Sequence, residues 1–291
     1  MNIWARSSSL FQTDAPFGAL DCLNNSISAY LWSVCNDYQA FCVHNWDFYY
    51  IQGSDNFGAS LSKEQIGRLL RETYGIEFQE IRFDEIPFNK MFIISLNAKQ
   101  LDFIKECYGK KDQMHYVLAQ VEADNVMLYS PFYSVRRLVT KDFLQQAWSE
   151  LKKPIFSLNQ LNTEVVKSNI SPYLLCEDYF TKYNSTLRNI FERYKTLSEQ
   201  NDYSEFESFF GRLRCIELAR RRHFEALETK SDFEDRILNG WVSVLKNVIR
   251  SHTLLGKYEV AVLNSLQEVV KYEIEYLKSF QYNVEQTDRN S

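Results

Sequence analysis

The chain has 291 residues, of which 45% are hydrophobic and 24% charged, and it is rich in tyrosine (18) and phenylalanine (21). This length allows one large domain or two ordinary ones with a substantial core. Only 9 glycines and 5 prolines are present, which indicates much helix and few long loops. The net charge of −5 and the isoelectric point near 5.6 argue against the basic surface of a nucleic-acid-binding protein.

Apolar periodicity predicts helices and strands in the first part of the chain. A helix follows Cys22, with apolar residues on one face (Leu23, Ile27, Tyr30, Leu31 and Val34). A second helix begins at Ser62, whose Ser-x-x-Gln sequence forms a capping box, and ends at Gly75. Residues 76–83 are predicted to form a strand.

The next elements extend to residue 158. The apolar run at residues 91–96 predicts a buried strand, and residues 98–111 form a helix or a structured excursion. Residues 115–121 and 125–130 are predicted to form the two strands of a hairpin. A helix over residues 140–151 and a last strand over 154–158 follow. Because strands and helices do not alternate regularly, the pattern indicates an α+β fold rather than repeated βαβ units.

The second part of the chain is predicted to be an all-α bundle. Ser171 and Pro172 provide a helix start, and helices are expected near residues 172–199, 203–229, 232–253 and 257–283, with Gly256 separating the last two. We therefore expect two domains, residues 1–160 and residues 161–291.

Two sequence features bear on compartment and cofactors. The N-terminal segment MNIWARSSSLFQ lacks the apolar stretch of a signal peptide, and no apolar run approaches the roughly 20 residues of a membrane span. The cysteines form no Cys-x-x-Cys pair and no zinc-finger spacing (Cys22, Cys35, Cys42, Cys107, Cys176 and Cys215). We expect a soluble cytoplasmic protein with reduced thiols, no metal and no cofactor, and without a membrane or nucleic-acid partner.

Cys22 is the candidate nucleophile because it stands where a helix begins. The exposed N–H groups at a helix N-terminus favour a thiolate, and attack on an acyl group also needs a histidine and donors for the oxyanion. His115, at the start of a strand, is the candidate proton carrier, and His44 is the alternative. We interpret His223 and His252 as surface or helix-end residues.

The order of these residues resembles the papain-like fold of bacteriocin-processing peptidases. In those enzymes Asp-Cys opens the first helix, a later strand begins with His and an aromatic residue, and the hairpin ends in Asp-Pro. Here the matching residues are Asp21-Cys22, then His115-Tyr116-Val117-Leu118, then Ser130-Pro131. The segment KDFLQQAW (141–148) also resembles the helix that closes that fold.

A closer resemblance is to the N-terminal domain of the BtrH-like acyltransferase family of butirosin biosynthesis. The segment MFIISLNAKQLDFIKECYGKKDQMHYVLAQV (91–121) is similar to that family's strand, tyrosine-rich excursion and histidine strand. The resemblance covers residues 15–158, and it implies a papain-like catalytic domain followed by a helical domain. It also implies transfer of an acyl group from the phosphopantetheine arm of an acyl or peptidyl carrier protein, through Cys22, to an amine of a small molecule.

In the resemblance, Cys22 attacks the thioester, His115 manages protons and Ser130 orients His115. Two features depart from the pattern. Ser130 stands where the peptidases have an aspartate, and a hydroxyl cannot stabilise an imidazolium by charge. The oxyanion donor is also open: the Cys22 backbone N–H could act with Gln12, Asn24 or Asn25.

Two other functions remain open at this point: a cysteine peptidase or amide hydrolase on the same fold, and a non-enzymatic binding protein with a decayed site. Two further segments are expected to have structural roles. We expect WDFYY (46–50) to pack in a core rather than line a pocket. We expect ARRRHF (219–224) to form a solvated helix face paired with glutamates rather than to bind an acidic partner.

Overall fold

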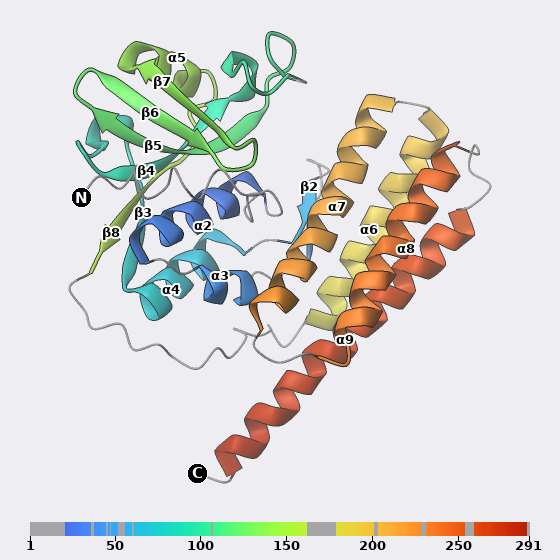
Figure 1. Ribbon diagram of the computed structural model, residues 1–291. Helices are drawn as coiled ribbons and strands as arrows, with labels where there is room; N and C mark the ends of the chain where they lie inside the picture. Colours follow the sequence, from blue (N-terminus) through green and yellow to red (C-terminus); the bar gives the residue numbers. More distant parts are fainter. Residues whose placement is uncertain are drawn as a thin grey trace. The chain divides into compact units, whose positions relative to one another are not determined.

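A computed structural model describes residues 21–289 except 36–37, 45, 47, 52–55, 60, 106, 162–178, 201–202, 228–230 and 254–258. The chain divides into two compact units (Figure 1). The first consists of residues 1–41 and 61–169, and the second of residues 42–60 and 170–291. Sequence patterns suggest a boundary at residue 160, and they give no sign that residues 42–60 belong with the helical unit.

The first unit is built on a six-stranded antiparallel sheet with the strand order β3-β8-β4-β5-β6-β7. The strands are β3 (Ile76–Ile81), β4 (Met91–Asn97), β5 (Met114–Glu122), β6 (Asn125–Ser130), β7 (Val135–Thr140) and β8 (Ile155–Gln160). The α+β class expected from the sequence is confirmed, as is the hairpin of β5 and β6. Strand β7 was not predicted from the sequence.

Helices cover both faces of this sheet (Figure 1). Helices α2 (Cys22–Cys35) and α4 (Lys63–Tyr74) pack on one face, and α5 (Lys141–Ser149) packs on the other. The alternation along β5 matches this arrangement, since Tyr116 and Leu118 belong to the first core and Val117 and Ala119 to the second. Strand β4 is buried along its whole length, as its continuous apolar run predicts.

The predicted ends of α4 are confirmed. The Ser62 hydroxyl accepts a hydrogen bond from the Gln65 backbone N–H, and the Gln65 side chain accepts one from the Ser62 backbone N–H. Gly75 ends the helix in the left-handed region with φ of 61°, which a residue without a Cβ adopts at little cost.

The excursion between β4 and β5 contains one turn of 3₁₀ helix, η3 (Ala98–Gln100), and is otherwise formed largely of turns in its described residues. Asn97 holds its two ends together. The Asn97 amide nitrogen donates to Asp112 (2.8 Å) and Glu150 (2.5 Å), and its oxygen accepts from the backbone N–H groups of Lys99 and Gln113. Because Asn97 pairs with Met114 across the sheet, these bonds also fix the start of β5.

The second unit contains a short hairpin and the helices of the C-terminal part. Strands β1 (Tyr49–Ile51) and β2 (Asn56–Gly58) pair antiparallel and contact α6 and α7. The helices are α3 (Gln39–His44), which crosses the division between the units, α6 (Tyr179–Gln200), α7 (Tyr203–Ala226), α8 (Glu234–Thr253) and α9 (Glu259–Arg289). The predicted helical region is therefore confirmed, whereas Ser171, Pro172 and Gly256 lie outside the described residues.

The core of the second unit includes residues from the hairpin segment. Trp46 and Phe48 are buried, and their rings contact Tyr183, His223 and Trp241. The expectation that residues 46–50 contribute to core packing is confirmed for these two aromatic residues.

Residues 219–224 depart in part from the predicted solvated face. Arg221 and Arg222 pair with Glu217 and Glu225 on the same helix, as expected. Arg220 and His223 are instead buried, with exposed fractions of 0% and 1%. His223 lies in the last turn of α7, as expected for a helix-end residue, but it is buried rather than on the surface.

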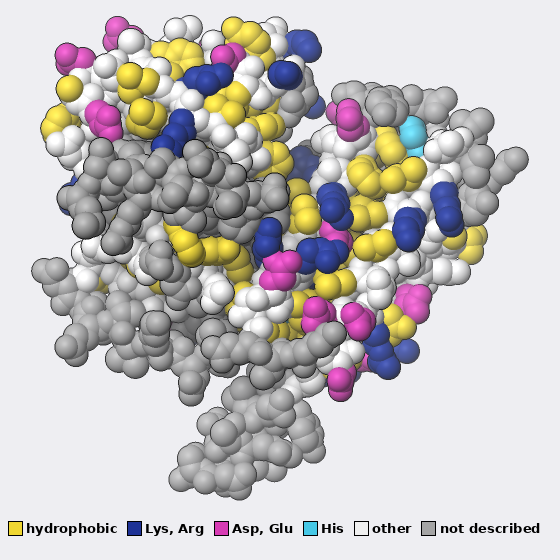
Figure 2. All heavy atoms as spheres, in the orientation of Figure 1, with side chains coloured by type: hydrophobic (Ala, Val, Ile, Leu, Met, Phe, Trp, Pro, Cys, Tyr) yellow, Lys and Arg dark blue, Asp and Glu magenta, His cyan; other side chains and the backbone are white. Residues whose placement is uncertain are grey.

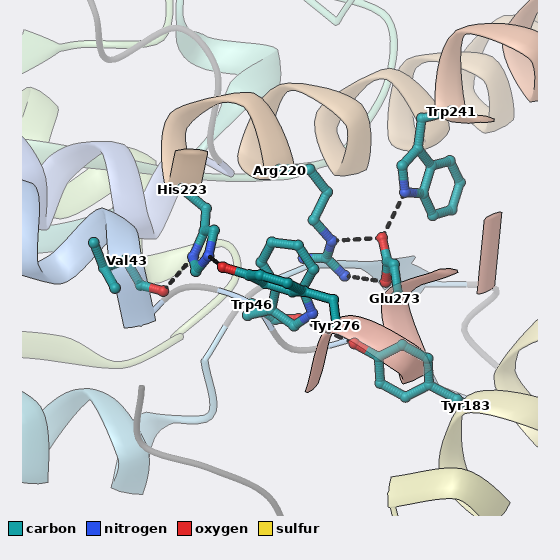
Figure 3. A network of polar contacts seen from close by, with 8 residues as sticks. All are labelled: Val43, Trp46, Tyr183, Arg220, His223, Trp241, Glu273 and Tyr276. Carbon is teal, nitrogen blue, oxygen red and sulfur yellow. Dashed lines mark hydrogen bonds and ion pairs between the residues drawn. The ribbon is translucent and has the colours of Figure 1, made fainter. Parts of the chain in front are cut away.

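Arg220 lies in a buried polar network drawn in Figure 3. Its Nε and Nη2 atoms donate to the Glu273 carboxylate at 2.7 and 3.0 Å, and Trp241 Nε1 donates to the same carboxylate at 2.6 Å. The guanidinium also lies 4.2 Å from the centre of the Trp46 ring, within cation–π range.

His223 joins three segments of the second unit (Figure 3). Its Nδ1 lies 2.6 Å from the Val43 carbonyl oxygen and its Nε2 lies 2.6 Å from the Tyr276 hydroxyl. Because a carbonyl only accepts hydrogen bonds, Nδ1 carries the proton, and a neutral ring accepts from Tyr276 at Nε2. Burial raises the pKa of Tyr276, so this hydroxyl keeps its proton to donate.

On the face shown in Figure 2, acidic and basic side chains are interspersed with hydrophobic ones. None of the helices that the structure describes has the length and apolar character needed to cross a membrane.

Candidate functional site

Cys22 is the first residue of α2, and Asp21 caps the helix. One Asp21 carboxylate oxygen, Oδ1, accepts the backbone N–H groups of Leu23 and Asn24, both at 2.9 Å. The other, Oδ2, accepts the Asn24 side-chain amide at 2.5 Å, and the Asp21 carbonyl accepts the Asn25 N–H. Cys22 therefore lies on a helical turn held by a carboxylate. The preference of aspartate for this position is the sequence signal for the cap.

Cys22 is half-buried and packs against the core between the sheet and α2. Burial, followed by the charge of Asp21, raises the pKa of its thiol from 9.0 to about 12. The backbone N–H groups of Tyr116, Cys22 and Leu23 act in the opposite direction, as expected for donors near a developing thiolate. The thiol is therefore protonated at neutral pH.

His115 is the second residue of β5, and its imidazole Nε2 lies 2.9 Å from the Ser130 hydroxyl at the end of β6. Both residues are buried, with exposed fractions of 7% and 1%. The rings of Phe103, Phe132 and Tyr133 surround the imidazole, with centroids 5.4 to 6.5 Å away. The structure thus brings together two of the residues that the sequence singles out.

The Cys22 thiol and the His115 imidazole both lie near the N-terminal end of β5. The Cys22 thiol is near the backbone N–H of Tyr116, and His115 is the preceding residue. By the alternation of β5, the His115 side chain belongs to the face of Val117 rather than that of Tyr116. Among the described residues, no hydrogen bond joins the Cys22 sulfur to His115. A direct exchange of a proton would require the two groups to approach further around this strand end.

The candidate oxyanion donors differ in their hydrogen bonds and in their burial. The side-chain nitrogen of Asn24 is committed to Asp21, and its Oδ1 is buried without a hydrogen-bond partner among the described residues. Asn25 is fully buried in α2, and Gln12 lies outside the described residues. The backbone N–H of Cys22 precedes the two that Asp21 binds.

The remaining histidines and cysteines contribute less to this site. The side chain of His44 and the whole of Cys176 lie outside the described residues. His252 is in the last turn of α8 and stacks on Phe206 at 3.7 Å, so its interpretation as a helix-end residue is confirmed. Cys42 and Cys107 are buried, whereas Cys35 and Cys215 are half-buried.

Within the described residues, no group of three or more histidine, cysteine, aspartate or glutamate side chains is arranged to hold a metal ion.

In a comparison with known proteins, no family model and no curated protein matches this chain.

Proposed function

We propose that this protein is a cysteine-dependent acyltransferase of secondary metabolism with a papain-like catalytic domain of the BtrH-like type. It would take an acyl group from the phosphopantetheine thioester of a carrier protein and transfer it through Cys22 to an amine of a small molecule. The observation that carries the proposal is that Cys22 at a helix start and the His115–Ser130 pair are gathered at one end of β5.

In the proposed reaction, His115 accepts the thiol proton as the Cys22 sulfur attacks the thioester carbonyl. The tetrahedral intermediate collapses, the carrier's thiol leaves with that proton, and a new thioester remains on Cys22. An amine then attacks this thioester, the amide is released, and the proton lost by the amine returns to Cys22 through His115. One thioester replaces another in the first half, and the second half runs downhill to the amide.

Ser130 supports this assignment through the tautomer of His115. If Nε2 carries the ring proton and donates to the Ser130 hydroxyl, Nδ1 is the nitrogen that accepts the proton from Cys22. The contact of 2.9 Å suits such a bond. A hydroxyl can also donate, so it selects this tautomer less strongly than a carboxylate does.

The raised pKa of Cys22 favours one version of the chemistry. Because the thiol is protonated at neutral pH, the proton must leave during attack, with His115 as a general base. A resting thiolate–imidazolium pair is not expected. The same raised pKa is the observation that favours the second candidate, a binding protein that has lost catalysis.

The test is intact-protein mass spectrometry after incubation with a carrier protein whose phosphopantetheine bears an acyl thioester. We expect an acyl adduct on the wild-type protein and on Cys35→Ala, and none on Cys22→Ala. Cys35 is a matched control because it is a half-buried cysteine at the other end of the same helix. An adduct that forms equally well on Cys22→Ala would refute the proposal.

Two additions separate transfer from the alternatives. If the adduct decays faster with added amines than in buffer, and an amide is produced, the reaction is transfer. If the adduct decays equally fast in buffer, or if the wild-type protein cleaves peptides and Cys22→Ala does not, the protein is a hydrolase. The absence of any adduct with a broad set of acyl carriers would favour the binding protein.

A further inference from the structure

Asp21 is not among the residues that the proposed reaction uses, yet its carboxylate accepts three hydrogen bonds at the start of α2. Three donors converge on it: the backbone N–H groups of Leu23 and Asn24 and the Asn24 side-chain amide, at 2.9, 2.9 and 2.5 Å. Cys22 lies between this capping carboxylate and the first hydrogen bond of the helix, from the Asn25 N–H to the Asp21 carbonyl, so its backbone is held on both sides.

The same carboxylate changes the electrostatics that a helix N-terminus normally provides. Unbound N–H groups and the helix dipole favour a thiolate. Here the Asp21 carboxylate, on the residue before Cys22, accepts hydrogen bonds from two of those N–H groups and brings a negative charge close to the thiol. After burial, the charge of Asp21 is the next cause that raises the pKa of Cys22.

We propose that Asp21 is a positioning residue with two effects: its carboxylate fixes the first turn of α2 and thereby the Cys22 sulfur, and its charge restrains the reactivity of the thiol. The effect on thiol reactivity stands without the proposed function. Its consequence for acyl transfer, which is to make attack depend on His115, rests on that function.

Asp21→Asn separates the two effects. The asparagine Oδ1 can accept the backbone N–H groups of Leu23 and Asn24 as before, because asparagine caps helices about as well as aspartate. Its amide nitrogen would face the Asn24 side chain, whose Oδ1 has no partner among the described residues. If the Asn24 amide rotates by half a turn, its Oδ1 accepts a hydrogen bond from the new amide nitrogen, and the Asn24 nitrogen takes the position that has no partner among the described residues. The backbone cap is kept and the charge is lost.

The experiment measures the rate of iodoacetamide alkylation at Cys22 from pH 6 to pH 10 by peptide mass spectrometry in the wild-type protein, Asp21→Asn and Asp21→Ala. Alkylation of Cys35 in the same samples is the internal reference. We expect Asp21→Asn to shift the Cys22 profile toward lower pH by about one unit, which is about a tenfold faster reaction at pH 7.5. The Cys35 rate and the melting temperature should not change.

Asp21→Ala removes the cap together with the charge, so its melting temperature should fall while that of Asp21→Asn does not. If Asp21→Asn fails to fold, Asp21→Ser serves as a second uncharged residue that can cap. A Cys22 profile that is unchanged in the folded uncharged variants, or that shifts together with that of Cys35, would overturn the proposal.

The two proposals can fail independently. A shifted alkylation profile without any acyl adduct on the wild-type protein leaves the restraint by Asp21 in place and removes the acyltransferase. An adduct on Cys22 with an unshifted profile does the reverse.

Discussion

The buried charge pair of the second unit allows a stability prediction with a worked magnitude. Arg220 and Glu273 have side chains with no exposed surface, and two hydrogen bonds join them. Glu273→Gln keeps the shape of the side chain and removes its charge. The Arg220 guanidinium then remains buried with the Trp46 ring and one amide oxygen as its remaining partners in the network of Figure 3.

The expected cost follows from what is left unpaired. Removing one partner of a buried ion pair destabilises a protein by about 3–5 kcal/mol, because the other charge has lost its compensation. In the double variant Arg220→Met with Glu273→Leu, neither charge of this pair is left. Among the contacts described above, the penalties are the Trp241 N–H without an acceptor, about 1–3 kcal/mol, and the lost cation–π contact of Trp46, up to about 2 kcal/mol. The apolar packing of the new side chains offsets part of these.

Urea unfolding followed by circular dichroism at 222 nm measures this prediction, since the second unit contains the longest helices. The control is Glu275→Gln on the same helix, because Glu275 is partly exposed and pairs with the exposed Lys271 at 3.9 Å. Such pairs contribute about 1 kcal/mol or less. If Glu273→Gln lowers the free energy of unfolding no more than Glu275→Gln does, the pair is not buried as described and the reasoning fails.

Three further predictions concern the first unit. Asn97→Leu should lower the free energy of unfolding by about 2–4 kcal/mol, measured by urea titration, because two backbone N–H groups lose an acceptor and two carboxylates each lose one donor; an unchanged stability would contradict it. The Cys22 thiol has a pKa of about 12 in the folded protein, against the ordinary value of 9.0. Its contribution to stability is therefore complete below pH 9 and is lost as the pH rises toward 12, because only the unfolded chain gives up this proton in that range. Wild-type stability should therefore fall more steeply above pH 9 than that of Cys22→Ala, by up to about 1.4 kcal/mol per pH unit, and equal slopes would refute the shift. Ser130→Ala should slow formation of the acyl adduct by about fivefold, the equivalent of one hydrogen bond of about 1 kcal/mol, and an unaltered rate would remove Ser130 from the site.

Local signals predicted the elements whose ends are set by nearby residues. The capping box at Ser62 and the left-handed Gly75 define α4 because each acts within one helical turn. The β5–β6 hairpin is equally local. Strand β7 carries Arg136 and Arg137 at the sheet edge and is exposed or half-exposed along its length, so its sequence lacks the alternation that marks a half-buried strand.

Contacts between distant residues explain what the sequence did not predict. His223 follows three arginines and resembles a surface position, yet its partners Val43 and Tyr276 are 180 and 53 residues away. Arg220 is likewise buried because Glu273, 53 residues away, neutralises it. The pairing of His115 with Ser130 was expected only through the family resemblance, since spacing alone does not bring a histidine and a serine together.

The charges around the candidate site run opposite to those of a site that stores an ion pair. A thiolate–imidazolium pair is favoured by N–H groups at the cysteine and by a carboxylate at the histidine. Here the carboxylate of Asp21 is at the cysteine end, and a neutral hydroxyl, Ser130, is at the histidine. Both features disfavour the separated charges and favour a neutral thiol with a neutral imidazole. Under the proposed function, Cys22 is therefore expected to attack an acyl group only when His115 takes its proton in the same step.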